Sequence, residues 1–143
     1  MHKIVPLISS GTAGPLGVLH LPRLWQKASL ENAGKIADGY PGCGAGYDQM
    51  VLDGLGVDRD AFLALIATKP TYVQTENWIK ENGTKVNADA ITELNAAITG
   101  YIHQDETRQE ILSTVGLPDG EPRDAINLNN LDDWDGFHAS VIK

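Results

Sequence analysis

Apolar residues recur along most of the chain at the spacing of a helix rather than in alternation. The first clear example has the i, i+3, i+4, i+7 spacing of a helix with one buried face, and it consists of Leu21, Leu24, Trp25 and Ala28. Later segments repeat this pattern, and no segment alternates like a half-buried strand. The pattern therefore predicts an all-α fold, a compact bundle of about six short helices. Heptads do not persist, which argues against a coiled coil.

Capping residues and glycines indicate where these helices begin and end. The first helix is expected to begin near Leu21, with Pro22 in its first turn, and to fade near residues 38–39. A second helix over residues 49–55 is expected to use Asp48 as its N-cap. The next four helices are expected to be capped by Asp58, by Thr71 with Gln74 as a capping box, by Asn87 and by Asp105.

The two ends of the chain lack a helical pattern. Residues 1–16 are predicted to form an irregular N-terminal arm, because glycine and proline near its end interrupt both helices and strands. Residues 17–143 are predicted to form a single all-α domain, and 143 residues is the usual length for one domain. The tail after Pro118 is expected to be acidic and turn-rich, with a short hydrophobic return at Trp134, Phe137, Val141 and Ile142.

Composition and charge exclude several classes of partner. Apolar residues make up 42% of the chain and charged residues 21%, with a net charge of −8. The basic residues are scattered, so we expect no binding to nucleic acid or to an anionic membrane. No apolar run reaches the roughly 18–20 residues of a membrane helix, and the apolar patch at residues 4–8 is too short for a signal peptide. We therefore expect a cytoplasmic protein.

The common cofactor and metal motifs are missing from the sequence. It contains no P-loop, no GxGxxG after a strand, no GxSxG and no HExxH, so no cofactor is expected. Cys43 is the single cysteine, which excludes an internal disulfide and a multi-cysteine metal site. The order His103-x-Asp105 with His138 downstream matches an iron site of two histidines and one carboxylate. Because Asp105 is better explained as a helix cap, no metal site is expected, and a metal enzyme is only a remote alternative.

A cationic stripe begins the first helix of this acidic chain. His20, Arg23 and Lys27 are three and four residues apart, so a helix places them on one side. The Arg fork suits a carboxylate or phosphate, and the stripe starts at a helix N-terminus, which also favours anions. This interpretation predicts an anion-binding corner. In the alternative, both cations are solvated and Lys27 pairs with Glu31 one turn on.

A glycine-rich loop over residues 39–46 follows the stripe and brings backbone N–H groups close to whatever lies against it. Cys43 is expected to be exposed in this loop, either as a nucleophile or as an unreactive thiol. Asp48 is either an N-cap or, in the alternative, a general base or a residue that orients His20. Tyr40 and Tyr47 are either packing residues whose hydroxyl groups are satisfied or the walls of a pocket, and Tyr47 is also a candidate proton donor.

Two further candidates lie in the predicted fourth helix. Glu76 either pairs with Lys80 one turn on at the surface or points inward toward the loop. Trp78 is either a core residue or part of a pocket wall. The candidate catalytic residues are therefore His20, Asp48 and Tyr47. The candidate ligand-binding residues are Arg23, Lys27, Tyr40, Cys43, Glu76 and Trp78.

The order of these residues resembles a known family over roughly residues 17–135. The segments that carry the likeness are His20-Leu-Pro-Arg23, Lys27, Gly34, the turn into Tyr47-Asp48, Leu55-Gly56-Val57-Asp58, Glu76-Asn-Trp78, Asn82-Gly83, Asn95 and Asp105. They resemble the bacterial domain-of-unknown-function family 5069, whose members are small, soluble and without an established activity. The resemblance implies a single all-α domain and directs attention to His20, Arg23, Lys27 and Asp48, but it implies no reaction and no role for Cys43.

Three functions remain open on these observations. The first is an enzyme or binding protein for a small anionic organic molecule. As an enzyme it would be a cofactor-independent lyase, isomerase or hydrolase, with acid–base chemistry by His20 and Asp48 and an anion clamp of Arg23 and Lys27. The second is a non-catalytic interaction protein or homodimer that uses apolar residues near either end of the chain. The remote third is the metal enzyme. We favour the first.

Overall fold

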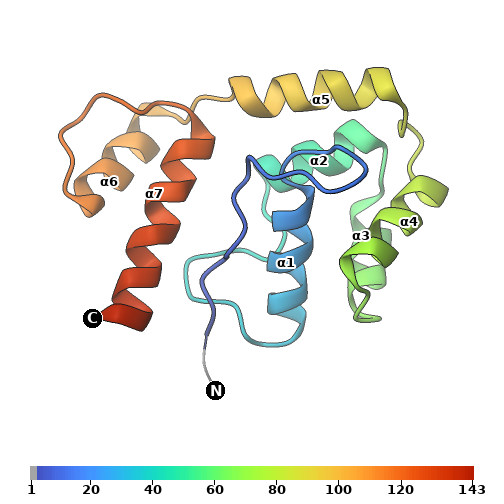
Figure 1. Ribbon diagram of the computed structural model, residues 1–143, viewed down its shortest axis with the longest axis horizontal. Coiled ribbons are helices and arrows are strands. Elements are labelled where there is room, and N and C mark those ends of the chain that lie inside the picture. Colours follow the sequence, from blue (N-terminus) through green and yellow to red (C-terminus); the bar gives the residue numbers. More distant parts are fainter. Residues whose placement is uncertain (1–2) are drawn as a thin grey trace.

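Seven α-helices and a final π-helical turn make up the structure, a computed structural model that describes residues 3–143 (Figure 1). The helices are α1 (Leu21–Asn32), α2 (Tyr47–Leu55), α3 (Arg59–Ile66), α4 (Tyr72–Asn82), α5 (Ala88–Gly100), α6 (Asp105–Val115) and α7 (Ala125–Phe137), followed by η1 (His138–Ile142). The prediction of an all-α fold is confirmed. Extended pairing within residues 3–143 is limited to isolated bridges such as that between Ile4 and Ile36.

The core surrounds α1, which packs against α2, α3 and α4. α5 lies across the end of this group, packs along α2 and reaches α7, which pairs with α6 on the other side of the molecule (Figure 1). Leu21, Leu24, Leu52, Leu55 and Phe62 are fully buried where α1, α2 and α3 meet. Burying each of these side chains contributes about 1.5–3 kcal/mol, so apolar packing holds the central helices in place.

Three of the predicted caps are present and two are not. The side chains of Asp58 and Asn87 accept hydrogen bonds from the first turns of α3 and α5, and Thr71 forms the expected capping box in α4. The assignment of Asp48 as an N-cap is wrong, because α2 begins at Tyr47 and Asp48 is its second residue. The carboxylate of Asp48 turns toward α1. The assignment of Asp105 is also wrong, since it is the first residue of α6 and accepts from Arg108 instead.

The first helix is shorter than its sequence pattern suggests. α1 ends at Asn32, and Gly34 follows with a positive φ of 70°. The N–H of Gly34 donates to Glu31 O and the N–H of Lys35 donates to Leu30 O, at 3.0 and 2.8 Å. These two bonds form a Schellman motif, which closes a helix and redirects the chain.

α7 lies where the sequence predicted a turn-rich tail, and that prediction is wrong. Asp124 caps the helix by accepting from the N–H of Asn127, and Leu128 is fully buried. The helical pattern is hard to recognise because a charged residue, Asp133, occupies an inward-facing position and is buried. No helix between residues 3 and 143 is long and apolar enough to cross a membrane.

The N-terminal arm has no helix between residue 3 and α1, and side chains of the helices hold it in place. Gln26 of α1 accepts from the N–H groups of residues 7 and 8. The carboxylate of Glu76 in α4 accepts from Leu16 N at 3.1 Å, and the amide of Asn95 in α5 bonds to the backbone of residues 17 and 19. The arm and the short segment that joins it to α1 therefore depend on polar contacts from three different helices.

Candidate functional site

Most of the predicted site residues meet at one cavity of about 270 Å³, here called the Asp48 cavity. It lies beside the first turns of α1 and α2, where the glycine-rich loop passes between these helices and the α7 side of the molecule. The predicted residues that line it are His20, Arg23, Lys27, Tyr40, Tyr47 and Asp48. The rest of its wall comes from the loop and from later segments, namely Gly39, Pro41, Gly44, Ala45, Gly46, Tyr101, His103, Asn129 and Asp132.

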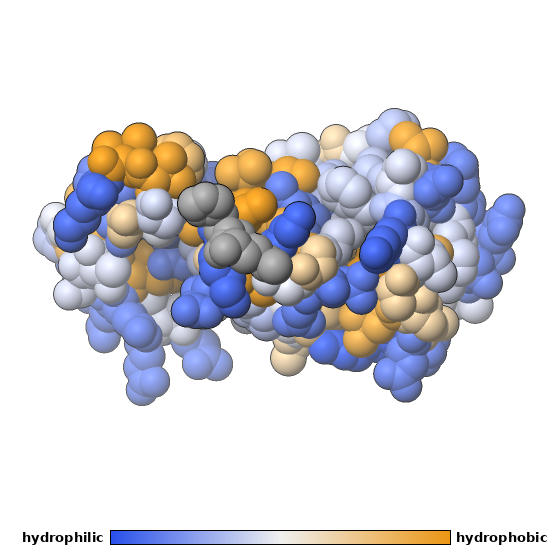
Figure 2. All heavy atoms as spheres, turned by 90° about the horizontal axis from the view of Figure 1, so that it is seen from below, coloured by the Kyte–Doolittle hydropathy of each residue, from blue (hydrophilic) through white to orange (hydrophobic). Residues whose placement is uncertain are grey.

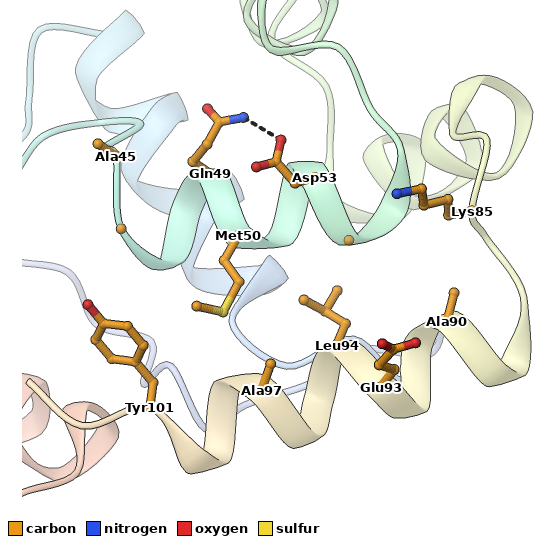
Figure 3. A pocket seen from close by; sticks show the side chains of 12 residues that line it. Ala45, Gln49, Met50, Asp53, Lys85, Ala90, Glu93, Leu94, Ala97 and Tyr101 are labelled. Carbon is orange, nitrogen blue, oxygen red and sulfur yellow. Dashed lines mark hydrogen bonds between the residues drawn. The ribbon is translucent and has the colours of Figure 1, made fainter.

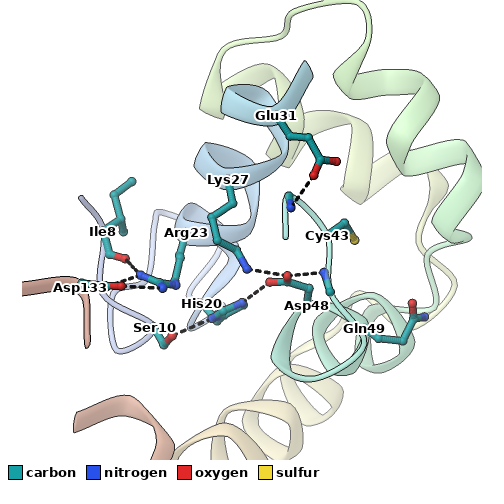
Figure 4. Close-up of polar contacts among 12 residues, drawn as sticks. Ile8, Ser10, His20, Arg23, Lys27, Glu31, Cys43, Asp48, Gln49 and Asp133 are labelled. Carbon is teal, nitrogen blue, oxygen red and sulfur yellow. Dashed lines mark hydrogen bonds and ion pairs between the residues drawn. The ribbon is translucent and has the colours of Figure 1, made fainter. Parts of the chain in front are cut away.

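His20 lies at the N-cap position of α1 in a left-handed conformation, with a φ of 69°. This conformation costs a non-glycine residue about 1–3 kcal/mol. It directs the imidazole between Ser10 and Asp48, with Nδ1 3.0 Å from Ser10 Oγ and Nε2 2.6 Å from Asp48 Oδ1 (Figure 4). The two hydrogen bonds offset the backbone cost, and the side chain is almost completely buried.

Asp48 joins three parts of the chain through its carboxylate. Besides His20, it accepts from Lys27 Nζ at 2.6 Å and from the N–H of Gly44 at 2.7 Å (Figure 4). Burial opposes its ionisation, but the hydrogen bond from His20 and the charge of Lys27 outweigh burial and lower the pKa of Asp48 to about 2. Asp48 is therefore a carboxylate at neutral pH, and it fixes the loop against α1.

Burial lowers the pKa of His20 below 6.5, and the hydrogen bond to Asp48 opposes this shift only in part. The neutral ring donates its Nε2–H to Asp48 and accepts from the Ser10 hydroxyl at Nδ1. The hydrogen-bonded order of Ser10, His20 and Asp48 thus resembles the catalytic triad of a serine hydrolase. Ser10 is completely buried, however, so its hydroxyl cannot reach a substrate. This arrangement positions Asp48 rather than activating a nucleophile.

Arg23 is already paired with a carboxylate from α7. Its guanidinium donates to the two carboxylate oxygens of Asp133 at 2.5 and 3.0 Å, and also to Ile8 O at 2.9 Å (Figure 4). This bidentate pair is buried, so Arg23 ties α1 to both α7 and the arm. The Arg fork predicted to hold a ligand therefore holds a carboxylate of the protein itself.

Lys27 does not pair with Glu31, the partner in the alternative interpretation, because Glu31 instead accepts from Gly42 N at 2.9 Å. The Lys27 ammonium lines the Asp48 cavity, and its one hydrogen bond within residues 3–143 goes to Asp48. An ammonium group carries three N–H donors. No residue of the described chain accepts a hydrogen bond from the other two donors of Lys27.

Cys43, Glu76 and Trp78 do not line the Asp48 cavity. The prediction that Cys43 is exposed is wrong: it is buried beside Arg59, and burial raises the pKa of its thiol. Glu76 does point inward, but toward the arm, where Tyr72 donates to it at 2.6 Å. Trp78 packs half-buried against the core.

Four further residues of the cavity wall were not predicted to lie in this site, and sequence analysis considered one of them, His103, only as a metal ligand. The ring of Tyr101 lies 5.3 Å from that of Tyr47, and His103 Nε2 is 3.0 Å from Asn129 Oδ1. Asp132 of α7 completes the group, and burial together with the neighbouring Asp133 raises its pKa. Sequence analysis placed Asp132 only in an acidic tail, because the helix that carries it was not recognised.

The arrangement of His103, Asp105 and His138 gives no metal site. His103 contacts Asn129, whereas Asp105 is exposed and pairs with Arg108. Among residues 3–143, no three His, Cys, Asp or Glu side chains lie where they could hold a metal ion together.

The fold and the cavity define a small all-helical protein with a buried polar cluster beside a small cavity. The members of the polar cluster are Ser10, His20, Arg23, Lys27, Asp48 and Asp133. The chain belongs to the family described as Domain of unknown function (DUF5069), whose model matches residues 10–133. This match confirms the resemblance drawn from the sequence and extends from Ser10 to Asp133, the first and last members of the polar cluster. No curated protein matches the chain.

Proposed function

We propose that the protein binds a small organic anion in the Asp48 cavity. The observation that carries this proposal is the convergence of Lys27, His20 and the N-terminus of α2 on one cavity. The anionic group of the ligand accepts from the two remaining N–H donors of Lys27. Because the guanidinium of Arg23 is paired with Asp133, it holds α1 and α7 together and does not bind the ligand.

The N-terminus of α2 is the second attraction for an anion. Gly46 occupies the N-cap position and provides no side-chain hydrogen bond to the amides of the first turn. These amides lack partners within the helix, and the helix dipole adds partial positive charge at the same place. Gly46 and Tyr47 line the cavity, so an anion there lies between the helix terminus and Lys27.

The size and walls of the cavity define the ligand further. A volume of about 270 Å³ lies just below the range of roughly 300–1,000 Å³ typical of small-molecule sites. Tyr40, Tyr47 and Tyr101 supply flat walls, and the hydroxyl of Tyr47 is already donated to Ile98 O. A carboxylic acid of a few carbon atoms fits this space better than a nucleotide or a sugar phosphate.

A cofactor-independent acid–base reaction on the bound acid is the enzymatic form of this proposal. Among the cavity carboxyl groups, the raised pKa of Asp132 makes it a better proton carrier near neutral pH than Asp48, whose pKa is about 2. In this form His20 and Asp48 position Lys27, and Asp132 transfers the proton. In an activity screen Asp132→Asn is expected to abolish turnover, whereas Asp60→Asn, at an exposed position of α3, is the control and is expected to leave it unchanged.

The binding proposal is tested by titrating the protein with acetate, butanoate, malonate and inorganic phosphate, followed by amide chemical shifts. We expect at least one of the carboxylates to shift the resonances of residues 44–48. Lys27→Gln is expected to weaken that binding at least tenfold, because it removes the positive charge of residue 27. Lys27→Arg keeps the charge and is expected to retain part of the affinity. Lys80→Gln, on the exposed side of α4, is the control.

Two results would contradict the proposal. One is that no anion of the panel shifts residues 44–48; the other is that Lys27→Gln, shown by circular dichroism to be folded, binds as tightly as the unmodified protein.

A second candidate function, self-association, is favoured by a separate observation. Leu7, Trp134 and Phe137 are exposed around a hollow of about 170 Å³, where the arm meets α7. Val141 and Ile142 follow in η1 and are also exposed. Figure 2 shows apolar surface over the C-terminal end of the chain and beside the N-terminal arm. We propose that a second copy of the chain covers this surface.

A further inference from the structure

A larger hollow of about 580 Å³ lies between α2 and α5 and is here called the α2–α5 groove (Figure 3). One face of α5 forms its floor, and the exposed side of α2 forms the opposite wall. The lining residues run from Ala90 of α5 through Glu93, Leu94 and Ala97 to Tyr101, which directly follows the helix. Ala90, Leu94, Ala97 and Tyr101 are spaced by three or four residues. At 1.5 Å per residue this face extends for about 16 Å.

The groove has an apolar floor and a polar rim. Met50 points from α2, and Leu94 and Ala97 point from α5, into the space between the helices (Figure 3). Gln49 donates to Asp53 at 2.9 Å along the rim, so neither of these polar groups turns toward the floor. Unbranched Met and aliphatic Leu adapt to a flexible chain, which makes the floor suited to an alkyl group.

The groove adjoins the Asp48 cavity. Ala45, Gly46 and Tyr101 line both spaces, and the first two have side chains too small to separate them. Tyr101 stands at the junction, with its ring half-exposed against Tyr47. The N-terminus of α2 therefore faces the polar cavity on one side and the apolar groove on the other.

From this shared wall we infer that the two spaces together form one site for a linear aliphatic carboxylic acid. Its carboxylate lies in the Asp48 cavity beside Lys27 and Gly46, and its alkyl chain passes Tyr101 and lies against Met50 and Leu94. This inference rests on the anion site proposed above and specifies the class of ligand that the site takes.

The length of the acid is the first variable of the test. Calorimetric titration with acetate, butanoate, hexanoate and octanoate is expected to give affinities that rise roughly two- to fourfold per methylene once the chain reaches the groove. Octanoate is also expected to shift the methyl resonances of Leu94 and Ala97, whereas acetate shifts residues 44–48 alone.

A matched pair of substitutions on α5 is the second variable. Ala97→Phe places a ring in the groove and is expected to weaken octanoate binding at least tenfold while leaving butanoate binding within about twofold. Ala96→Phe is the control, because Ala96 is the exposed neighbour on the same helix and does not line the groove. Circular dichroism melting checks that both variants are folded.

The outcomes separate this inference from the proposal on which it rests. If butanoate binds through Lys27 but octanoate binds no more tightly, or if the two alanine variants behave alike, the inference fails and the anion site stands. Octanol bound as tightly as octanoate would also overturn the inference, since the groove would then act without the carboxylate. If no acid binds, both proposals fail.

Discussion

Asp48 is the residue on which the polar cluster depends, because His20, Lys27 and the loop amide of Gly44 all donate to it. Exposed ion pairs contribute at most about 1 kcal/mol, whereas breaking a buried pair leaves an uncompensated charge. Lys27 and Asp48 are both buried. The carboxylate is therefore needed for stability whatever ligand the cavity takes.

Asp48→Asn tests this role directly. The substitution leaves the Lys27 ammonium buried without its partner, and we expect the free energy of unfolding to fall by about 3–5 kcal/mol. Urea denaturation at pH 7 measures the loss. Asp53→Asn, on the exposed side of the same helix, is the control and is expected to change stability by less than about 1 kcal/mol. Similar losses in the two variants would contradict the assignment.

His20 makes the stability dependent on pH. Its pKa in the folded protein is lowered from 6.5 by burial, so the unfolded chain takes up a proton first as the pH falls. The contribution of His20 is therefore fully present above about pH 6.5 and is lost below it. Asp48 adds a second loss, of about 2 kcal/mol, as the pH falls from 3.8 through its folded pKa of about 2.

Urea midpoints between pH 8 and pH 5 check the first of these losses. We expect the difference in stability between the unmodified protein and His20→Asn to shrink toward pH 5. Asn is chosen because it tolerates the left-handed backbone at position 20. A difference that stays constant across this range would show that residue 20 does not titrate on unfolding.

The residues of the cationic stripe could be placed from sequence, but their partners could not. Helical spacing put His20, Arg23 and Lys27 on one side of α1, and all three line the Asp48 cavity. Asp133 is 110 positions from Arg23, and Ser10 belongs to an arm without a regular pattern. Such pairings depend on tertiary packing, which no local spacing encodes.

At the scale of elements, caps and glycines predicted most helices because these signals act within one turn. α7 was missed because Asn and Asp are weak helix formers and because a buried carboxylate interrupts its apolar face. Its helical state is supported from outside by Arg23, which holds Asp133 against α1. The helix thus depends on a partner from the other end of the chain.

A double-mutant cycle measures how strongly α7 depends on this pair. We expect Arg23→Met alone to lower the free energy of unfolding by about 3–5 kcal/mol, because Asp133 is left buried and unpaired. Arg23→Met combined with Asp133→Leu is expected to recover most of that loss, since neither charge then remains. Urea denaturation of the unmodified protein, the two single variants and the double variant gives the coupling free energy between Arg23 and Asp133. Losses of stability that simply add would argue against a specific pair.

At the scale of the whole molecule, the Asp48 cavity lies where two groups of helices meet. Its lining residues come from α1, α2 and the loop between them on one side and from α7 and the segment after α5 on the other. Figure 1 shows these two groups of helices, with α5 running between them. The arm and the bidentate pair between Arg23 and Asp133 connect the groups. Local patterns can therefore predict the fold class, whereas the site exists only once distant segments are assembled.

We propose that the exposed apolar surface at the arm and α7 mediates self-association. Trp134 and Leu7 are 63% and 69% exposed, and contiguous apolar surface of this kind is typical of an interface. Each chain carries a net charge of −8, so two copies repel one another at low ionic strength. Since salt shortens the Debye length from about 10 Å at 0.1 M, we expect dimerisation to strengthen as salt is raised.

Sedimentation equilibrium at increasing concentrations of sodium chloride measures this association. Trp134→Gln is expected to weaken the dimer at least tenfold at every salt concentration, because it removes the largest exposed apolar side chain of the surface. Val73→Gln is the matched control, since Val73 is 59% exposed on α4 and outside the proposed contact. A chain that stays monomeric at high salt, or one that Val73→Gln dissociates equally, would contradict the dimer. Neither result would affect the anion site, because the Asp48 cavity and the apolar surface have no lining residue in common. They are linked only through the ion pair between Arg23 and Asp133.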